Sequence, residues 1–106
     1  MVKSNCGKMT LGQKIKELRA SKNMLQRQLA AKLEIGDGFL SKVEHDQKVL
    51  KREHLCSISQ IFDYPLEELD ALWVATRIYE LVKDEQSALA ALKVAEEQIK
   101  YGKANA

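Results

Sequence analysis

The stretch Gly36-Asp37-Gly38 is the feature that most limits what this chain can fold into. Glycine and aspartate are among the residues that least favour a helix interior. Apolar residues nevertheless recur at helical spacing before this stretch, and Leu40 and Val43 resume that spacing directly after it. A tight turn between two short helices explains both observations, because a turn tolerates residues that weaken a helix. We therefore expect one helix to end before this stretch and another to begin within it.

Apolar periodicity predicts helices along most of the chain, and nothing in the sequence predicts a strand. With one proline and five glycines in 106 residues, there are few residues that would interrupt helices. Thr10 is the expected N-cap of the first helix and Ser87 that of the last, which Gly102 is expected to end. The expected fold class is all-α, with helices over about 11–21, 26–33, 53–62, 66–85 and 86–103, a short helix after Gly36, and a cation-rich loop at 45–53.

Length and composition indicate one soluble domain with an appended element. The chain is 45% hydrophobic and 30% charged, which is typical of a globular protein. No apolar run is long enough for a signal peptide or a membrane span, so a cytoplasmic protein without membrane contact is expected. Cys6 and Cys56 are too few for a disulfide framework and lack metal-ligand spacing, which favours two reduced thiols.

Charge is distributed unevenly along the chain. Residues 1–60 hold 12 Lys and Arg against 6 Asp and Glu, whereas residues 61–106 hold 5 against 9. A basic front half is compatible with binding a polyanion, and an acidic rear half would be repelled by one. Solvated helix faces also carry lysine, so charge alone leaves a nucleic-acid partner and an ordinary surface equally open.

A family resemblance rests on the segment LGQKIKELRASKNMLQRQLAAKLEIGDGFLSKVEHDQK and the later LCSISQIFDYPLEEL. Residues 11–69 resemble the Xre/Cro-type helix-turn-helix family, to which phage lambda repressor and restriction-modification controller proteins are related. The resemblance implies a lambda-repressor-like five-helix DNA-binding domain, followed here by a C-terminal helical extension. The matching residues are Gln26, Leu29 and Ala30 of the second helix, Ile35 of the turn, and Leu40, Ser41, Val43 and Glu44 of the recognition helix.

Three positions depart from the family pattern. Leu25 stands where Ser or Thr usually caps the second helix, so that cap is lost or shifted. Glu34 stands where glycine commonly makes the turn; either Glu34 adopts a left-handed conformation or the turn is rebuilt around Gly36. Gly36 replaces the usual Ser cap of the recognition helix, at a cost of a few tenths of a kcal/mol. These departures affect the reading surface more than the fold.

The resemblance implies that the start of the recognition helix reads base edges in the major groove of DNA. Lys42 can donate to guanine, and Ser41 to several base edges or to phosphate. Gln26 and the cations after the helix are expected to contact phosphate, although each cation could equally be a solvated loop charge. The candidate DNA-binding residues are Gln26, Asp37, Gly38, Phe39, Ser41, Lys42, His45, Lys48, Lys51 and Arg52.

Several of these residues have a second interpretation. Asp37 can accept a hydrogen bond from cytosine, but stabilisation of the helix dipole is slightly favoured. Phe39 could contact a thymine methyl group or pack against a neighbouring subunit. Glu44 more often holds the helix-turn-helix scaffold together than it touches DNA. A zinc site formed by His45 and His54 is improbable because no third ligand accompanies them.

The sequence does not indicate an enzyme. It contains no glycine-rich phosphate loop, no HExxH motif and no Cys/His pair with supporting spacing. The acidic pairs Glu67/Glu68 and Glu96/Glu97 are ordinary on solvated helix surfaces. No cofactor, metal or small-molecule substrate is expected.

The rear of the chain has more apolar surface than a five-helix domain needs, so we expect it to form a homodimer. The alternative is that it folds back on its own core. The candidate dimerisation residues are Trp73, Ile78, Tyr79, Val82, Leu89 and Leu92.

The expected division is a flexible arm at 1–10, a helix-turn-helix DNA-binding domain at 11–69 and a dimerisation element at 70–106. The predicted function is a sequence-specific, double-strand DNA-binding transcriptional regulator that acts as a homodimer on a palindromic operator. The competing interpretation is an antitoxin or adaptor whose C-terminal helices bind another protein.

Overall fold

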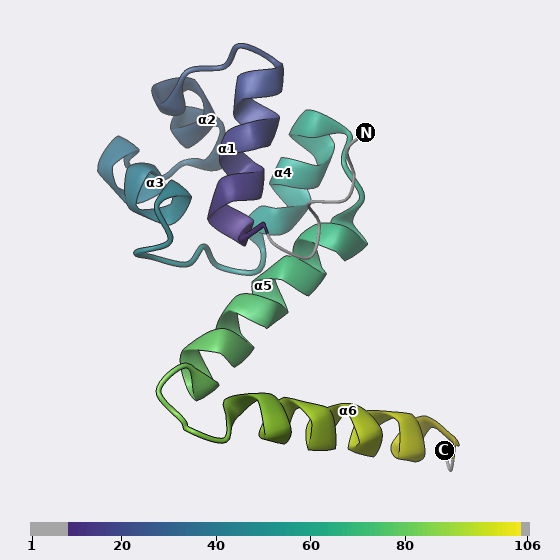
Figure 1. Ribbon diagram of the computed structural model, residues 1–106. Coiled ribbons are helices and arrows are strands. Elements are labelled where there is room, and N and C mark those ends of the chain that lie inside the picture. Colours follow the sequence, from purple (N-terminus) through teal and green to yellow (C-terminus); the bar gives the residue numbers. More distant parts are fainter. Residues whose placement is uncertain (1–8, 105–106) are drawn as a thin grey trace. The chain divides into compact units, whose positions relative to one another are not determined.

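The computed structural model describes residues 9–104, and within that range it contains helices and no strand (Figure 1). The all-α prediction is therefore confirmed over these residues. The expected flexible arm lies almost entirely outside them. The helices are α1 (Leu11–Ser21), α2 (Gln26–Leu33), α3 (Asp37–Glu44), α4 (His54–Phe62), α5 (Leu66–Val82) and α6 (Ala88–Ala104).

The chain divides into two compact units, the first ending at Thr76 and the second beginning at Arg77. Helix α5 contributes its first part to one unit and its last part to the other. The functional boundary between residues 69 and 70 stays a prediction.

The first unit is built around one apolar core that draws on α1 to α5. Leu40 and Val43, the inward pair predicted for α3, are both buried, as are Leu29 and Leu33 of α2. Leu18 is partly buried against this core. The buried apolar side chains are Leu11, Ile15, Leu29, Ala30, Leu33, Leu40, Val43, Leu50, Leu55, Ile58, Phe62 and Leu69.

Local capping explains where α1 and α2 begin. Thr10 caps α1 as predicted: its side chain accepts the backbone N–H of Gln13, and its own N–H donates to the Gln13 side chain, each at 3.1 Å. Leu25 supplies no side-chain cap to α2, but its backbone N–H donates to Oε1 of Gln28 at 2.7 Å. Half of a capping box therefore compensates for the missing Ser or Thr.

The turn between α2 and α3 resolves the alternative left open at Glu34. Glu34 has φ 58° and ψ 43°, a left-handed conformation, whereas Gly36 has φ −76° and serves as the N-cap of α3. A non-glycine residue thus carries the left-handed position, which costs it roughly 1 kcal/mol relative to glycine. The turn is not rebuilt around Gly36.

The second unit contains α6, none of whose residues from 88 to 102 is buried. The prediction that Gly102 ends this helix is wrong, since α6 continues to Ala104. Glycine ends a helix by adopting positive φ, and Gly102 does not. Within the described residues, no helix is both long and apolar enough to cross a membrane.

Candidate nucleic-acid interface

Helices α2 and α3 are joined by the turn Glu34–Gly36, which two backbone hydrogen bonds secure. The N–H of Ile35 donates to the Ala30 carbonyl at 3.0 Å, and the Gly36 carbonyl accepts the N–H of Leu40 at 3.0 Å. Leu40 is fully buried, so the inward side of α3 is fixed against the core. Because the inward side of α3 is fixed, the side of the helix that faces outward is fixed as well.

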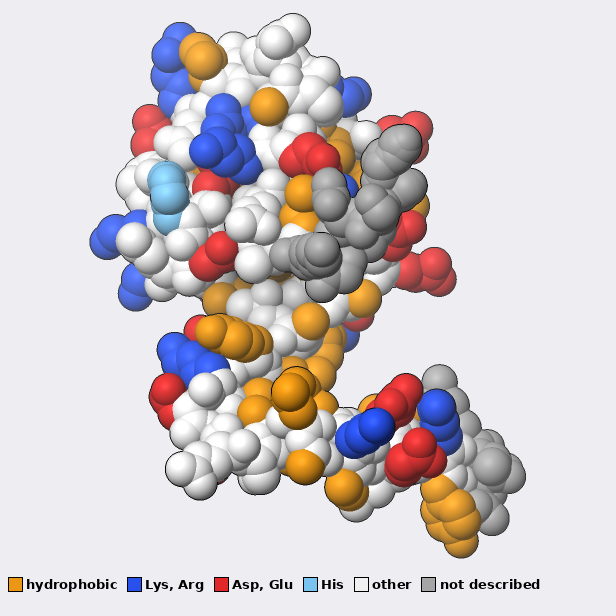
Figure 2. All heavy atoms as spheres, viewed as in Figure 1, with side chains coloured by type: hydrophobic (Ala, Val, Ile, Leu, Met, Phe, Trp, Pro, Cys, Tyr) orange, Lys and Arg blue, Asp and Glu red, His pale blue; other side chains and the backbone are white. Residues whose placement is uncertain are grey.

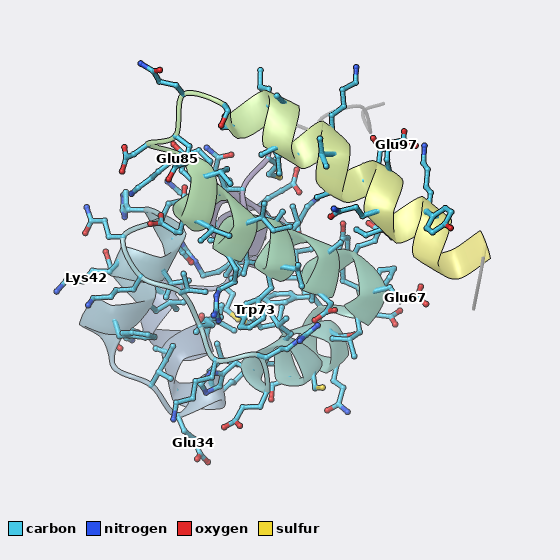
Figure 3. All side chains as sticks on the ribbon, turned by 90° about the horizontal axis from the view of Figure 1, so that it is seen from below. Glu34, Lys42, Glu67, Trp73, Glu85 and Glu97 are labelled. Carbon is cyan, nitrogen blue, oxygen red and sulfur yellow. The ribbon has the colours of Figure 1, made fainter. Side chains whose placement is uncertain are left out.

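The first turns of α3 present a contiguous exposed face. Asp37, Gly38 and Lys42 are exposed, Phe39 keeps 36% of its surface accessible, and Ser41 is half-buried. Lys42 projects outward from the helix in Figure 3. The structure thus brings together, on one short helix, five of the residues predicted from sequence to contact DNA.

The last turn of α3 is held by a buried ion pair. Glu44 is only 4% exposed, and its carboxylate accepts hydrogen bonds from Nε and Nη2 of Arg19 at 2.8 and 2.9 Å. Arg19 also donates to the Met24 carbonyl at 2.9 Å, and Nε2 of Gln26 donates to Glu44 at 3.0 Å. One carboxylate therefore ties α3 to the end of α1 and the start of α2, the scaffold role predicted for Glu44 from sequence.

The ion pair also sets the charge state of Glu44. Burial by itself raises the pKa of this carboxyl group, but the hydrogen bonds from Arg19 and Gln26 outweigh burial, so the pKa lies below its ordinary value. The hydrogen bond to Glu44 correspondingly raises the pKa of Arg19. Both groups are charged at neutral pH.

Gln26 has a structural partner in addition to its predicted role. Its amide nitrogen is occupied by Glu44, while the residue itself opens α2, where backbone N–H groups are free to meet an anion. A phosphate contact by Gln26 stays a prediction. The bond to Glu44 fixes the orientation of its side chain.

Gly12 is a structural residue that the sequence reasoning did not single out. A Cβ atom at Gly12 would collide with the Val43 carbonyl and would lie 2.6 Å from Oδ1 of Asp46. Nearby, the Thr10 hydroxyl donates to Oδ2 of Asp46 at 2.9 Å. The start of α1 therefore lies directly against the end of α3, and the available signal was a glycine inside an amphipathic helix.

The cation-rich loop after α3 carries exposed Lys48 and Lys51, as expected. Figure 2 shows Lys and Arg side chains, with some acidic ones among them, along the side of this unit formed by α2, α3 and that loop. Arg52 differs from the two lysines, because its guanidinium donates to both carboxylate oxygens of Asp70 at 2.7 and 2.8 Å. Those hydrogen bonds lower the pKa of Asp70.

The two histidines lie apart from any metal-binding arrangement. His45 is the C-cap of α3, and its Nδ1 lies 2.8 Å from the Ser41 carbonyl. His54 is the first residue of α4. Across residues 9–104, no group of three or more His, Cys, Asp or Glu side chains is placed to hold a metal ion.

The dimerisation residues predicted from sequence fall into two environments. Trp73 belongs to the first unit, packs against its core and donates from Nε1 to the Leu50 carbonyl at 2.8 Å. Ile78, Tyr79 and Leu89 belong to the second unit and are exposed, as is Leu92, while Val82 is half-buried. Five of the six predicted residues therefore belong to the second unit, and four of those five are exposed.

Comparison with known proteins agrees with this geometry. A family model described as a helix-turn-helix domain matches residues 12–80, which span α1 to most of α5. Searches of curated proteins and of solved structures gave no match. The match covers more than half of the chain, and the chain belongs to the helix-turn-helix domain family.

Proposed function

We propose that this protein is a sequence-specific transcriptional regulator that binds double-stranded DNA as a homodimer on a palindromic operator, in the manner of Xre/Cro-type proteins. The observation that carries the proposal is the exposed first half of α3 within a helix-turn-helix domain. A short helix anchored on one side by Leu40 and Val43 has the size and rigidity to enter the major groove.

Base reading would come from the exposed face of α3. Lys42 supplies a cation for guanine O6 and N7, and Ser41 a hydroxyl that can donate or accept. Asp37 is the first residue of α3, so its carboxylate interacts favourably with the helix dipole. A carboxylate there would also be able to accept a hydrogen bond from cytosine N4. Gly38 leaves room for the DNA, because nothing lies within 4 Å of the position a Cβ would take.

Phosphate contacts would flank this face on both sides. The start of α2 offers Gln26 and backbone N–H groups, and the loop after α3 offers His45, Lys48 and Lys51. Contacts of this kind fix the register of the protein on the duplex and make binding depend on salt. The residues of this loop follow directly on the recognition helix. The phosphate contacts of the loop and the base contacts of α3 can therefore act on the same stretch of DNA.

The proposal is tested by removing the two lysines most central to it. Lys42→Ala with Lys51→Ala should weaken binding to a duplex selected by the wild-type chain from a randomised pool by about tenfold or more, and should reduce the salt slope by about one to two units. Lys93→Ala with Lys100→Ala removes the same charge from α6 and should change neither. Wild-type affinity in the Lys42/Lys51 variant would show that DNA is not read through this face.

A second experiment tests whether Phe39 contacts the methyl group of a thymine. Replacing thymine by deoxyuracil in the selected duplex removes only the C5-methyl group. If Phe39 contacts a thymine methyl, wild-type binding should weaken at one position, by about 1 kcal/mol, because that methyl group is no longer there to be buried. Phe39→Ala should be insensitive to the same replacement. Equal sensitivity in both proteins would exclude the methyl contact.

Dimerisation is supported by the exposed apolar residues of the second unit (Figure 2). Leu89 is 82% exposed, and α6 has no buried residue from 88 to 102, so this chain alone gives the helix almost no tertiary stabilisation. Residues 77–106 hold five Lys and Arg and five Asp and Glu, so two copies would meet without net repulsion. A dimer reading two half-sites about 34 Å apart would also supply the phosphate contacts that one small domain lacks.

Size-exclusion chromatography with light scattering at micromolar concentration tests the dimer. The wild-type chain should have twice the monomer mass, and Leu89→Glu should reduce it toward the monomer while the helical content of the first unit is kept. Gln98→Glu adds the same charge nine residues from Leu89, on the opposite side of α6, and as the control it should stay dimeric. A monomeric wild-type chain would contradict the dimer and favour another protein as the partner of this unit.

A further inference from the structure

Two residues predicted from sequence for separate tasks contact each other in the structure. Sequence reasoning assigns Arg52 to phosphate binding and Trp73 to a dimer interface, yet the Arg52 guanidinium lies 4.9 Å from the centroid of the Trp73 ring. At that distance a guanidinium over an indole is attractive. Both residues belong to the first unit, so this contact is part of one folded body.

Asp70 and Trp73 lie on successive turns of α5. Both bind the end of the loop between α3 and α4. Asp70 accepts two parallel hydrogen bonds from Arg52, and Trp73 donates to the Leu50 carbonyl at 2.8 Å. Figure 3 shows Trp73 among the side chains at the centre of the view. We call Arg52, Asp70 and Trp73 together the α5 latch.

The start of the same loop is held separately. The Asp46 carboxylate accepts a hydrogen bond from the Thr10 hydroxyl, and the Gln47 N–H donates to the Lys42 carbonyl at 2.8 Å. At the second of these attachments Leu50 is 1% exposed, whereas Lys48 and Lys51 on either side of it are exposed. The loop therefore holds its two cations in a defined place.

We propose that the α5 latch is a positioning device: Asp70 and Trp73, through Arg52 and the Leu50 carbonyl, place Lys48 and Lys51 against the phosphates of the DNA duplex. This inference rests on the proposed function. It assigns a role in DNA binding to two residues of α5 that need not touch DNA. It also gives Arg52 a structural role in place of a direct phosphate contact, because the Nε and Nη2 edge of its guanidinium pairs with Asp70 and its face lies over the Trp73 ring.

A direct Arg52–phosphate contact and the latch predict opposite signs for one substitution. Asp70→Asn removes an acid from the first unit and releases Arg52. If Arg52 binds phosphate directly, both changes strengthen DNA binding. If the latch positions the loop, the same variant binds more weakly although its net charge has become more positive.

The experiment compares Asp70→Asn and Trp73→Phe with the wild type, using a duplex selected by the wild-type chain from a randomised pool. Trp73→Phe changes no charge and removes the N–H donor to Leu50. We expect both variants to bind about tenfold more weakly, and the salt slope to fall by about one unit for each phosphate that the loop no longer neutralises. Glu17→Gln, which removes an acid from the Lys14–Glu17 pair of α1, is the control and should leave both values unchanged.

Amide hydrogen exchange without DNA separates positioning from general destabilisation. In both latch variants, the backbone amides of His54 and Leu55, which donate to the Lys51 and Arg52 carbonyls, should exchange faster, while those of the buried residues of α2 keep their wild-type protection. Unchanged or tighter DNA binding by Asp70→Asn would overturn the latch and leave the proposed function standing. Failure of the wild-type chain to retain any duplex would overturn the proposed function and the latch together.

Discussion

The two ends of α3 differ in what surrounds them. At the end of the helix, Val43 and Glu44 are buried, and Gly12 of α1 lies so close that no side chain fits between. At the start, Asp37 and Gly38 are exposed, and a Cβ added to Gly38 would meet open space. The protein itself fixes one end of the helix and leaves the other uncovered.

This difference indicates how eight residues can act as a reading element. So short a helix is unstable alone, and its direction must come from tertiary contacts. The Glu44 ion pair and the contact with Gly12 supply that direction at the buried last turn of the helix. Changes at the fixed end should therefore act on stability first, and changes at the open end on DNA binding first.

The largest effect is expected from removing the buried carboxylate. Glu44→Ala leaves the Arg19 guanidinium without its main partner in a mostly buried setting, and should lower the free energy of unfolding by about 3–5 kcal/mol. Denaturant titration followed by circular dichroism measures it. Glu17→Ala, at the more exposed Lys14–Glu17 pair, is the control and should cost under about 1 kcal/mol. Equal losses in the two variants would contradict the special role of the fixed end.

A somewhat smaller loss is expected at the contact between α1 and α3. Gly12→Ala places a methyl group against the Val43 carbonyl and Asp46, so α1 must move away from α3. Overpacking of this kind costs about 1–3 kcal/mol, although alanine favours a helix more than glycine does. A melting temperature equal to or above that of the wild type would show that the two helices are free to separate.

Lowering the pH should reduce the stability that the Glu44 ion pair gives to the fold, without any substitution. Because the pKa of Glu44 is lower in the folded protein than in the unfolded chain, its ionised form stabilises the fold at pH values above the ordinary carboxyl range. That contribution is lost as the pH falls through the folded pKa. The loss should be smaller than in Glu44→Ala, since the side chain still fills its place. The difference in unfolding free energy between wild type and Glu44→Gln should shrink as the pH falls from 7 toward about 3; a constant difference would contradict this assignment.

The sequence predicted the elements better than the contacts between them. Apolar spacing placed α1 and α2 at their observed bounds, and the resemblance placed the turn and Glu44, because helical period and turn chemistry are local properties. The burial of Leu50 in a charged loop has no local signal. The pairing of Arg52 with Asp70 joins residues far apart in sequence, so the sequence indicated an unpaired cation at Arg52. The bond from Trp73 to the Leu50 carbonyl is equally non-local, so the sequence assigned Trp73 to a dimer interface.

The smallest effect on stability, and the sharpest test of the comparison, is expected at the open end. Gly38→Ala adds a methyl group that meets no protein atom within 4 Å, and alanine is the better helix former, so unfolding should become harder by up to about 1 kcal/mol. The same methyl group would stand between α3 and the DNA, where we expect several-fold weaker binding. Gly12→Ala should instead lose stability and binding together. A Gly38→Ala protein that gained stability and kept full affinity would show that the open end of α3 does not approach DNA closely, because the added atoms would then have found room there too.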